Sequence, residues 1–151
     1  MKKMLLCSAS ALVLAACGGG GGGGTVSAPT PTPVTPTSTQ YAQQCTADNP
    51  YRADADVVPK AGTLSIEKQW IKAYMDESYL WYDSMPAVDA SLSAYSGSIT
   101  SLDGRGVPLP LSNYFEALKT KLTTPSGKLT DQFSFTYPTK QWNQLSQSGV
   151  V

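Results

Sequence analysis

Apolar side chains recur at near-helical spacing between residues 65 and 82. The apolar stripe consists of Ile66, Trp70, Ile71, Tyr74, Met75 and Trp81, and the charged residues Glu67, Lys68, Lys72, Asp76 and Glu77 take the other side. A period of about 3.6 residues is typical of an amphipathic helix. Ser65 can cap this helix and Pro86 ends the segment, so we expect a helix from Ser65 to about Tyr82. Lys72 and Asp76 form an i,i+4 ion pair on it, which stabilises a helix only slightly.

This predicted helix is dense in aromatic side chains, namely Trp70, Tyr74, Tyr79, Trp81 and Tyr82. Aromatic residues bury the most area per residue, so we interpret the group as the core of a small domain. The alternative is a platform for a ligand or a sugar. On the core interpretation, Trp81→Ala costs roughly 3–5 kcal/mol, and the hydroxyls of Tyr79 and Tyr82 stay in contact with water.

A second apolar stripe follows Ser112, which is the expected N-cap of a second helix. The stripe is formed by Tyr114, Phe115, Leu118 and Leu122, and Pro125 and Gly127 follow it. Proline and glycine at these places end a helix. Between the two helices, residues 88–110 are small and polar, and Asp103-Gly104-Arg105-Gly106 indicates a tight turn in a loop.

The pattern then changes to a period of two. Phe133, Phe135 and Tyr137 alternate with Ser134 and Thr136, which predicts a half-buried strand that ends at Pro138. Val150-Val151 has the composition of the first residues of another strand.

A third short helix is predicted between these strands. Thr139 can cap it, Trp142 and Leu145 are expected to point inward, and Gly149 fits the C′ position. The expected fold class is therefore mainly α: a small helical domain of about three helices with one or two short strands, preceded by a signal peptide and a disordered tether.

The N-terminal segment has the layout of a secretory leader. Lys2 and Lys3 are followed by an apolar run from Met4 to Ala16, which is shorter than the roughly 20 residues that a membrane-spanning helix needs. A glycine run from Gly18 to Gly24 and a Pro/Thr-rich stretch come next, and both compositions are typical of a linker. We therefore divide the chain into a signal peptide (1–16), a lipid anchor and tether (17–44) and a helical domain (45–151).

Leu14-Ala15-Ala16-Cys17 resembles the lipobox of bacterial lipoproteins. The resemblance implies cleavage before Cys17 and acylation of Cys17, which makes a lipid membrane the expected partner. Several acyl chains anchor a protein stably, whereas one chain binds only marginally. Gly18 stands where an aspartate would favour inner-membrane retention, so we expect a lipid-anchored protein of the outer membrane, on the periplasmic face or the cell surface. The alternative is an ordinary secretory signal followed by a chance cysteine.

The amino-acid composition excludes several kinds of partner and catalytic site. The chain has 11 basic and 11 acidic residues and no histidine. No basic patch is available to neutralise phosphates, so we expect no nucleic-acid partner. Without histidine the chain cannot use a Ser-His-Asp or Cys-His mechanism. A zinc site is also not expected, because Cys45 and carboxylates are the only ligand types that remain. We predict no catalytic residue, no metal and no cofactor.

The lead-in to the helical domain also lacks a metal motif. Asn49-Pro50-Tyr51 indicates a turn, and Arg52, Asp54 and Asp56 are expected to be solvated. Acidic residues near this turn raise calcium as an alternative, but their spacing does not match an EF-hand loop. Cys45 has no partner cysteine in the mature chain, because Cys7 leaves with the leader and Cys17 is the lipid site.

The helical domain resembles a segment near the start of bacterial C-terminal processing (tail-specific) serine peptidases. The resemblance rests on Glu67-Lys68-Gln69-Trp70, on Tyr74-Met75-Asp76-Glu77-Ser78-Tyr79-Leu80-Trp81-Tyr82, on Tyr114-Phe115-Glu116-Ala117-Leu118, on Asp131-Gln132-Phe133-Ser134-Phe135-Thr136, and on Trp142-Asn143-Gln144-Leu145 with Ser148-Gly149-Val150. It implies a helical region that precedes a PDZ-like domain and a catalytic core with a Ser-Lys dyad, acting on polypeptide substrates in the full-length protein. Neither of those domains is visible here, so we expect a chain cut short and inactive alone.

Three functions remain open. The chain is the N-terminal part of a lipoprotein peptidase, or a self-contained lipoprotein module that binds a peptide or a glycan through its aromatic helix, or a regulatory remnant that docks on an intact peptidase. We favour the first.

Overall fold

The computed structural model describes residues 35–54 and 58–149, which belong to one compact unit, Val34–Val151. The predicted signal peptide, the lipid site at Cys17, the glycine run and the strand at 150–151 lie outside the described residues, as does Asp56. No helix in the described part of the chain is long and apolar enough to cross a membrane.

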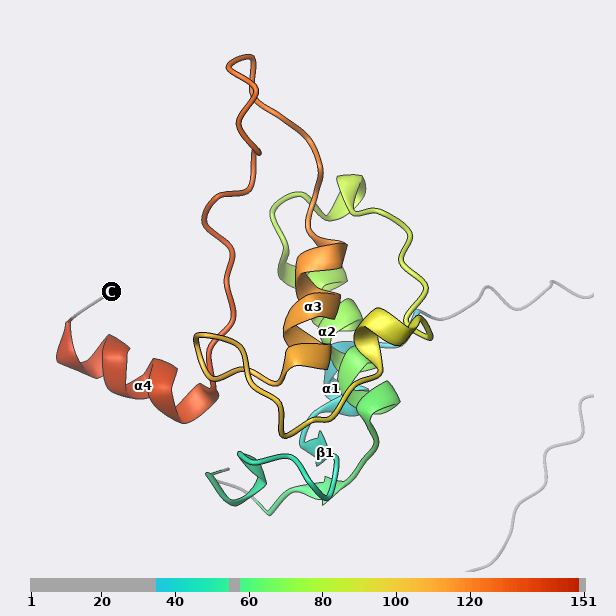
Figure 1. Cartoon of the computed structure of the whole chain (residues 1–151), viewed down its shortest axis with the longest axis vertical. Coiled ribbons are helices and arrows are strands. Elements are labelled where there is room, and N and C mark those ends of the chain that lie inside the picture. The colour runs from blue at the N-terminus through green and yellow to red at the C-terminus, as the bar shows by residue number, and fades with distance from the viewer. Residues whose placement is uncertain (1–34, 55–57, 150–151) are drawn as a thin grey trace, which may run out of the picture. The chain divides into compact units, whose positions relative to one another are not determined.

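The described residues are mainly helical, as predicted (Figure 1). The helices and strands are α1 (Ser38–Tyr41), β1 (Gln44–Cys45), β2 (Lys60–Ala61), α2 (Leu64–Ser78), α3 (Leu109–Leu118) and α4 (Thr139–Ser148), and single turns of 3-10 helix occur at Arg52–Asp54, Tyr82–Ser84 and Ser93–Tyr95. Helix α1 lies within the segment that the sequence pattern assigns to the tether, and it packs against α2.

Helix α2 begins earlier and ends earlier than predicted. Thr63, not Ser65, is the N-cap, because its side chain accepts a hydrogen bond from the Ile66 backbone N–H at 3.3 Å. The helix stops at Ser78, where Tyr79 turns to an extended conformation while its N–H still donates to Met75 O at 2.9 Å. The predicted extension to Tyr82 is therefore wrong.

Helix α3 also begins before its predicted cap. Pro108 precedes it and Pro110 lies in its first turn, a position that tolerates proline because the first N–H groups have no helical partner. Ser112 is an interior residue of the helix, and its hydroxyl donates to Asp103 Oδ2 at 2.7 Å. The serine therefore fastens the 103–106 turn to α3 instead of capping the helix.

The core lies between α2 and α3. Its buried residues are Met75, Tyr79, Tyr114, Phe115 and Leu118, with Trp81 and Ile71 among the partly buried side chains packed against it. Tyr79 and Trp81 meet edge to face with ring centroids 5.6 Å apart, an arrangement that aromatic rings favour. The core interpretation therefore holds for Tyr79, and Tyr82 is 62% exposed, as predicted.

The strands lie elsewhere than predicted. β1 and β2 pair in parallel, with Gln44 opposite Lys60 and Cys45 opposite Ala61. The Arg52 guanidinium donates to Cys45 O at 2.6 Å and to Lys60 O at 3.1 Å, so Arg52 ties the two strands together instead of being solvated.

Residues 133–137 form no strand. The Asp131 carboxylate accepts hydrogen bonds from the N–H groups of Phe133 and Ser134 at 3.1 and 2.9 Å, which uses donors that a strand would need for pairing. No other described strand lies beside this segment. Phe133 is 75% exposed, so the alternating pattern does not correspond to a buried face.

Helix α4 is present as predicted, with two corrections. Pro138 precedes it and Thr139 is its first residue, without a side-chain cap bond. Gly149 ends it with φ +69°, the left-handed conformation expected at C′. Trp142 is not directed into the core: it is 37% exposed and packs against Phe135, with ring centroids 5.7 Å apart.

Candidate functional site

A groove of about 1000 Å³ lies among the described residues. Five segments line it: 41–45 around β1, 49–54 beyond it, 67–71 on α2, 107–111 at the start of α3, and 136–147 leading into and along α4. Figure 1 shows α4 as the element reached last by the chain. The groove therefore forms only when segments distant in sequence come together.

Glu67 is a buried ionisable residue that lines this groove. It is 8% exposed, and its carboxylate accepts hydrogen bonds from the Thr46 N–H at 2.6 Å and from Asn49 Nδ2 at 3.2 Å. The prediction that the charged side of α2 lies away from the packed side is wrong for this residue. Because both partners bind the carboxylate, Glu67 holds the segment after β1 in place.

Lys68, the next residue, is also buried, at 6% exposure. Its ammonium donates to Ala90 O and, at 3.0 Å, to Tyr95 O. These two carbonyls belong to the loop between α2 and α3, so the lysine fixes that loop against the helix. Lys72 behaves as predicted and forms an ion pair with Asp76 at 2.6 Å.

Cys45 is a free, half-buried thiol that lines the groove. Burial raises the pKa of this thiol, the Glu67 charge raises it further, and the Arg52 guanidinium lowers it in part. A thiol with a raised pKa is a poor nucleophile at neutral pH, because the thiolate is the reactive form.

Trp70 and Tyr74 form an exposed aromatic pair on α2. Their rings stack with centroids 5.1 Å apart and an interplanar angle of 13°. Trp70 is 38% exposed and Tyr74 is 49% exposed, so the core interpretation is wrong for these two residues. Trp70 also lines the groove, which leaves the alternative of a ligand platform open for this part of the helix.

Helix α4 contributes carboxamides to the lining of the groove. Asn143, Gln144 and Gln147 line the groove and are exposed, and their side chains make no hydrogen bond to another described residue. Gln43 adds another carboxamide from the segment before β1. It is the one non-glycine residue of the described chain with a left-handed backbone, at φ +64°, a conformation that costs energy unless its surroundings hold it.

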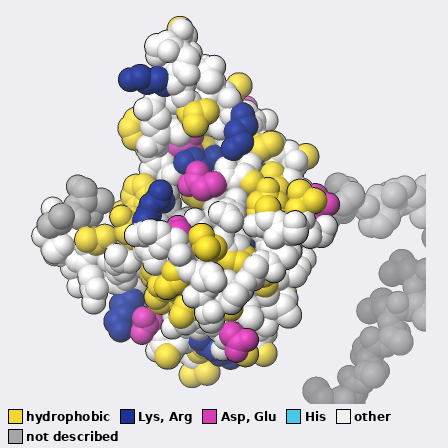
Figure 2. Space-filling model, viewed as in Figure 1, with side chains coloured by type: hydrophobic (Ala, Val, Ile, Leu, Met, Phe, Trp, Pro, Cys, Tyr) yellow, Lys and Arg dark blue, Asp and Glu magenta, His cyan; other side chains and the backbone are white. Residues whose placement is uncertain are grey.

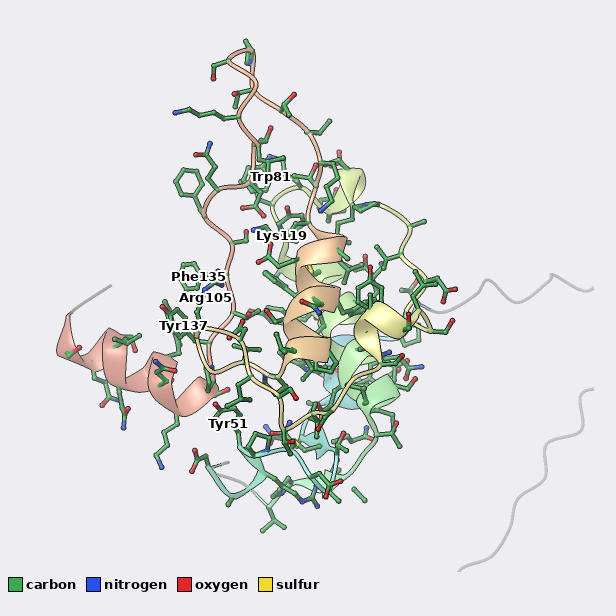
Figure 3. All side chains as sticks on the ribbon, in the orientation of Figure 1. Tyr51, Trp81, Arg105, Lys119, Phe135 and Tyr137 are labelled. Atoms are coloured by element: carbon green, nitrogen blue, oxygen red, sulfur yellow. The ribbon has the colours of Figure 1, made fainter. Side chains whose placement is uncertain are left out.

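Tyrosines complete the walls of the groove. The Tyr51 hydroxyl donates to Gly106 O, which joins the first described segment to the 103–106 turn. Tyr137 stacks against Trp142 with ring centroids 6.4 Å apart. Figure 3 labels both tyrosines, one on each of these distant segments.

The lining carries almost no free charge. Lys140 pairs with Asp54 at 3.1 Å, and the Glu67 carboxylate is 8% exposed and accepts hydrogen bonds from Thr46 and Asn49. Figure 2 shows lysine and arginine side chains interspersed with acidic ones on the visible face, without a large area of one sign. The chemistry offered to a ligand is therefore aromatic faces and neutral hydrogen-bonding groups.

A second polar cluster lies in the core, away from the groove. The Tyr79 hydroxyl donates to Asp131 Oδ2 at 2.8 Å and accepts from the Thr120 N–H at 3.0 Å, so the prediction that this hydroxyl is wet is wrong. Burial raises the pKa of Tyr79 to about 12. Burial alone would raise the pKa of Asp131, but hydrogen bonds from Ser134, Tyr79 and Phe133 hold it below the usual value.

Neither the groove nor the polar cluster around Tyr79 has the arrangement of a Ser-Lys dyad. Among residues 35–54 and 58–149, no lysine ammonium is hydrogen-bonded to a serine hydroxyl, and no group of three or more Cys, Asp or Glu side chains could hold a metal ion. The Lys119 ammonium, for example, donates to the backbone oxygen of Ser134 at 2.9 Å, not to its hydroxyl, and lies 3.8 Å from Asp131 Oδ2.

Sequence reasoning missed the groove because its lining comes from five separate segments. Two features of the sequence could have indicated the groove: the aromatic density of α2 and the run of carboxamides in α4.

Comparison with known proteins gives one match. A family model described as the peptidase S41 N-terminal domain matches residues 67–104. No curated protein and no solved structure matches the chain. The matched segment runs from Glu67 in α2 to Gly104 in the turn before α3, and it includes Trp70 and the buried Lys68.

Proposed function

We propose that the chain is a lipid-anchored lipoprotein that carries the non-catalytic N-terminal part of a C-terminal processing peptidase. The proposal is supported by the match of residues 67–104 to the peptidase S41 N-terminal domain. The role of this part in the peptidase is to scaffold the neighbouring domains or to gate the substrate. Polypeptides of the periplasm or the cell surface are the substrates of the full-length enzyme.

The family match carries this proposal, and the contacts of the matched segment support a scaffolding role. Met75 and Tyr79 supply buried core residues, and Lys68 fastens the loop that follows α2. These are packing and positioning contacts. A segment with such contacts holds neighbouring elements in place, as a scaffolding role requires.

Membrane anchoring is supported by the leader, by the lipobox-like Leu14-Ala15-Ala16-Cys17 and by the long linker after it. The test is the Cys17→Ser variant of the full chain, with membrane fractionation and incorporation of a labelled fatty acid as readouts. We expect the unaltered chain to be labelled and membrane-bound, and the variant to be unlabelled and released. Cys45→Ser is the matched control and should remain labelled. A Cys17→Ser protein that stays tightly membrane-bound would contradict the lipoprotein proposal.

The non-catalytic role has its own test. The purified full chain is incubated with an unstructured peptide that has a free C-terminus, and cleavage is followed by mass spectrometry. We expect a folded protein, judged by cooperative thermal unfolding, that cleaves nothing. Cleavage that purifies with the chain would show that it contains a catalytic site and would overturn the proposal.

A second candidate is a binding module, favoured by one observation: Trp70, predicted to be buried, is 38% exposed at the groove.

A further inference from the structure

We propose that the groove between α2 and α4 binds a neutral oligosaccharide. Trp70 is the stacking platform, and the carboxamides of Asn143, Gln144 and Gln147 supply hydrogen bonds from the other wall. This proposal rests on the second candidate function, the binding module, and names its ligand class; it does not depend on the lipid anchor.

Charge is the first argument. The ionisable side chains of the lining are already engaged, Lys140 with Asp54 at 3.1 Å and Glu67 with Thr46 and Asn49. A charged ligand would lose part of its hydration in the groove without gaining an opposite charge. The lining therefore suits a ligand without net charge.

The hydrogen-bonding groups are the second argument. A carboxamide presents an acceptor oxygen and two donor hydrogens, and a sugar hydroxyl likewise both donates and accepts. Asn143 and Gln147 are one helical turn apart on α4 and Gln144 lies between them, so the three form one surface of the helix. Their side chains are exposed and have no hydrogen-bond partner among the described residues, so a ligand can bind them without breaking an existing bond.

Trp70 is the third argument. Tyr74 stacks on the Trp70 ring at 5.1 Å and 13°, which fixes the orientation of the indole before a ligand arrives. A rigid aromatic side chain offers apolar contact area at a low cost in conformational entropy. The C–H faces of a sugar ring are apolar and pack on such a surface, while its hydroxyls remain free for the carboxamides.

The groove fits an extended peptide less well. Recognition of a peptide by strand addition needs an exposed sheet edge, and β1, the strand that lines the groove, has only two residues. A peptide terminus would need an unpaired charge, which the lining does not provide. The volume of about 1000 Å³ is at the upper end of ligand sites and accommodates more than one ring.

The test uses the full chain and three neutral probes: cellohexaose, maltohexaose and N,N′,N″-triacetylchitotriose. Binding is measured by isothermal titration calorimetry and by tryptophan fluorescence. We expect at least one probe to bind saturably. Trp70→Ala should weaken that binding by about tenfold or more through loss of the stacking area. Gln144→Ala should weaken it by roughly two- to tenfold, the effect of one lost hydrogen bond.

Gln141→Ala is the matched control, because Gln141 is a glutamine of the same helix that does not line the groove. Thermal unfolding is recorded for every variant. Gln144 is exposed, so its variant reports on binding even where Trp70→Ala lowers stability. The proposal is wrong if no probe binds, or if binding is unchanged in both Trp70→Ala and Gln144→Ala. It is also wrong if an uncharged peptide binds with the same sensitivity to these variants while the sugars do not.

Discussion

The hydroxyl of Tyr79 donates a hydrogen bond to Asp131, 52 residues further along the chain, at 2.8 Å. The same hydroxyl accepts a hydrogen bond from the Thr120 N–H. One oxygen therefore joins the end of α2 to residues 120 and 131, which flank a turn closed by the antiparallel bridge between Thr123 and Leu129. Both partners are buried, so one side-chain oxygen satisfies two buried polar groups that are distant in sequence.

We expect Tyr79→Phe to lower the free energy of unfolding by about 1–3 kcal/mol, because it leaves the buried Thr120 N–H without its acceptor and removes one of the hydrogen bonds to the Asp131 carboxylate. Urea denaturation measures this change. Tyr82→Phe is the control: Tyr82 is 62% exposed, and its variant should stay within about 0.5 kcal/mol of the unaltered protein. Equal effects of the two variants would contradict the role given to Tyr79.

Stability should fall in acid, partly through Asp131. Its hydrogen bonds hold the folded-state pKa of Asp131 below the usual value despite burial. A carboxyl whose pKa is lowered on folding stabilises the protein fully above the unfolded pKa, about 3.9, and the stabilisation is lost as the pH falls through the folded pKa. Urea midpoints at decreasing pH should therefore drop below about pH 4. Asp131→Asn should be less stable at neutral pH and show a shallower acid dependence; an unchanged slope would exclude Asp131 as a source.

Gly62 should not tolerate a side chain. A Cβ at this position would lie 2.5 Å from the Gln44 backbone carbon and 2.6 Å from its oxygen, so β1 would have to move away. We expect Gly62→Ala to cost about 1–3 kcal/mol, the usual effect of overpacking. Gly104→Ala is the control, because no atom lies within 4 Å of its added Cβ. Thermal unfolding of both variants tests the contact, and a tolerated Gly62→Ala would show that β1 can shift freely.

Lys68→Met should loosen the loop between α2 and α3. The variant removes the donor that serves Ala90 O and Tyr95 O and leaves both carbonyls unsatisfied, at a cost of about 1–3 kcal/mol. Hydrogen exchange should rise in residues 90–95. Lys72→Met is the control on the same helix, since Lys72 only forms a partly exposed ion pair, which contributes little. Faster exchange in both variants alike would show that the effect is not local to Lys68.

The sequence pattern predicts the helical class, the position of α2 and α4 and the stop at Gly149, because these follow from local periodicity and from the backbone freedom of glycine. It misplaces helix starts where two candidate caps stand close together, as Thr63 and Ser65 do. Only the backbone geometry decides between such neighbours.

Long-range partners explain the remaining differences. Glu67 was assigned to the polar side of α2, yet its partners Thr46 and Asn49 come from another part of the chain. The alternation at 133–137 indicates a strand only if a second strand lies beside it, and Asp131 instead takes the amides. The groove needs five segments at once, so periodicity within one segment could not reveal it.

Helix α1 also determines how the domain bears mechanical load. Ser38 donates to the Glu77 carboxylate through its N–H at 2.7 Å and through its hydroxyl at 2.5 Å, close to the C-terminal end of α2. A pull on the chain from the N-terminal side of Ser38 therefore reaches these two bonds first and is passed to the end of the longest helix. The first yielding event under tension would be the detachment of α1 from Glu77, and the core between α2 and α3 would remain intact at that stage.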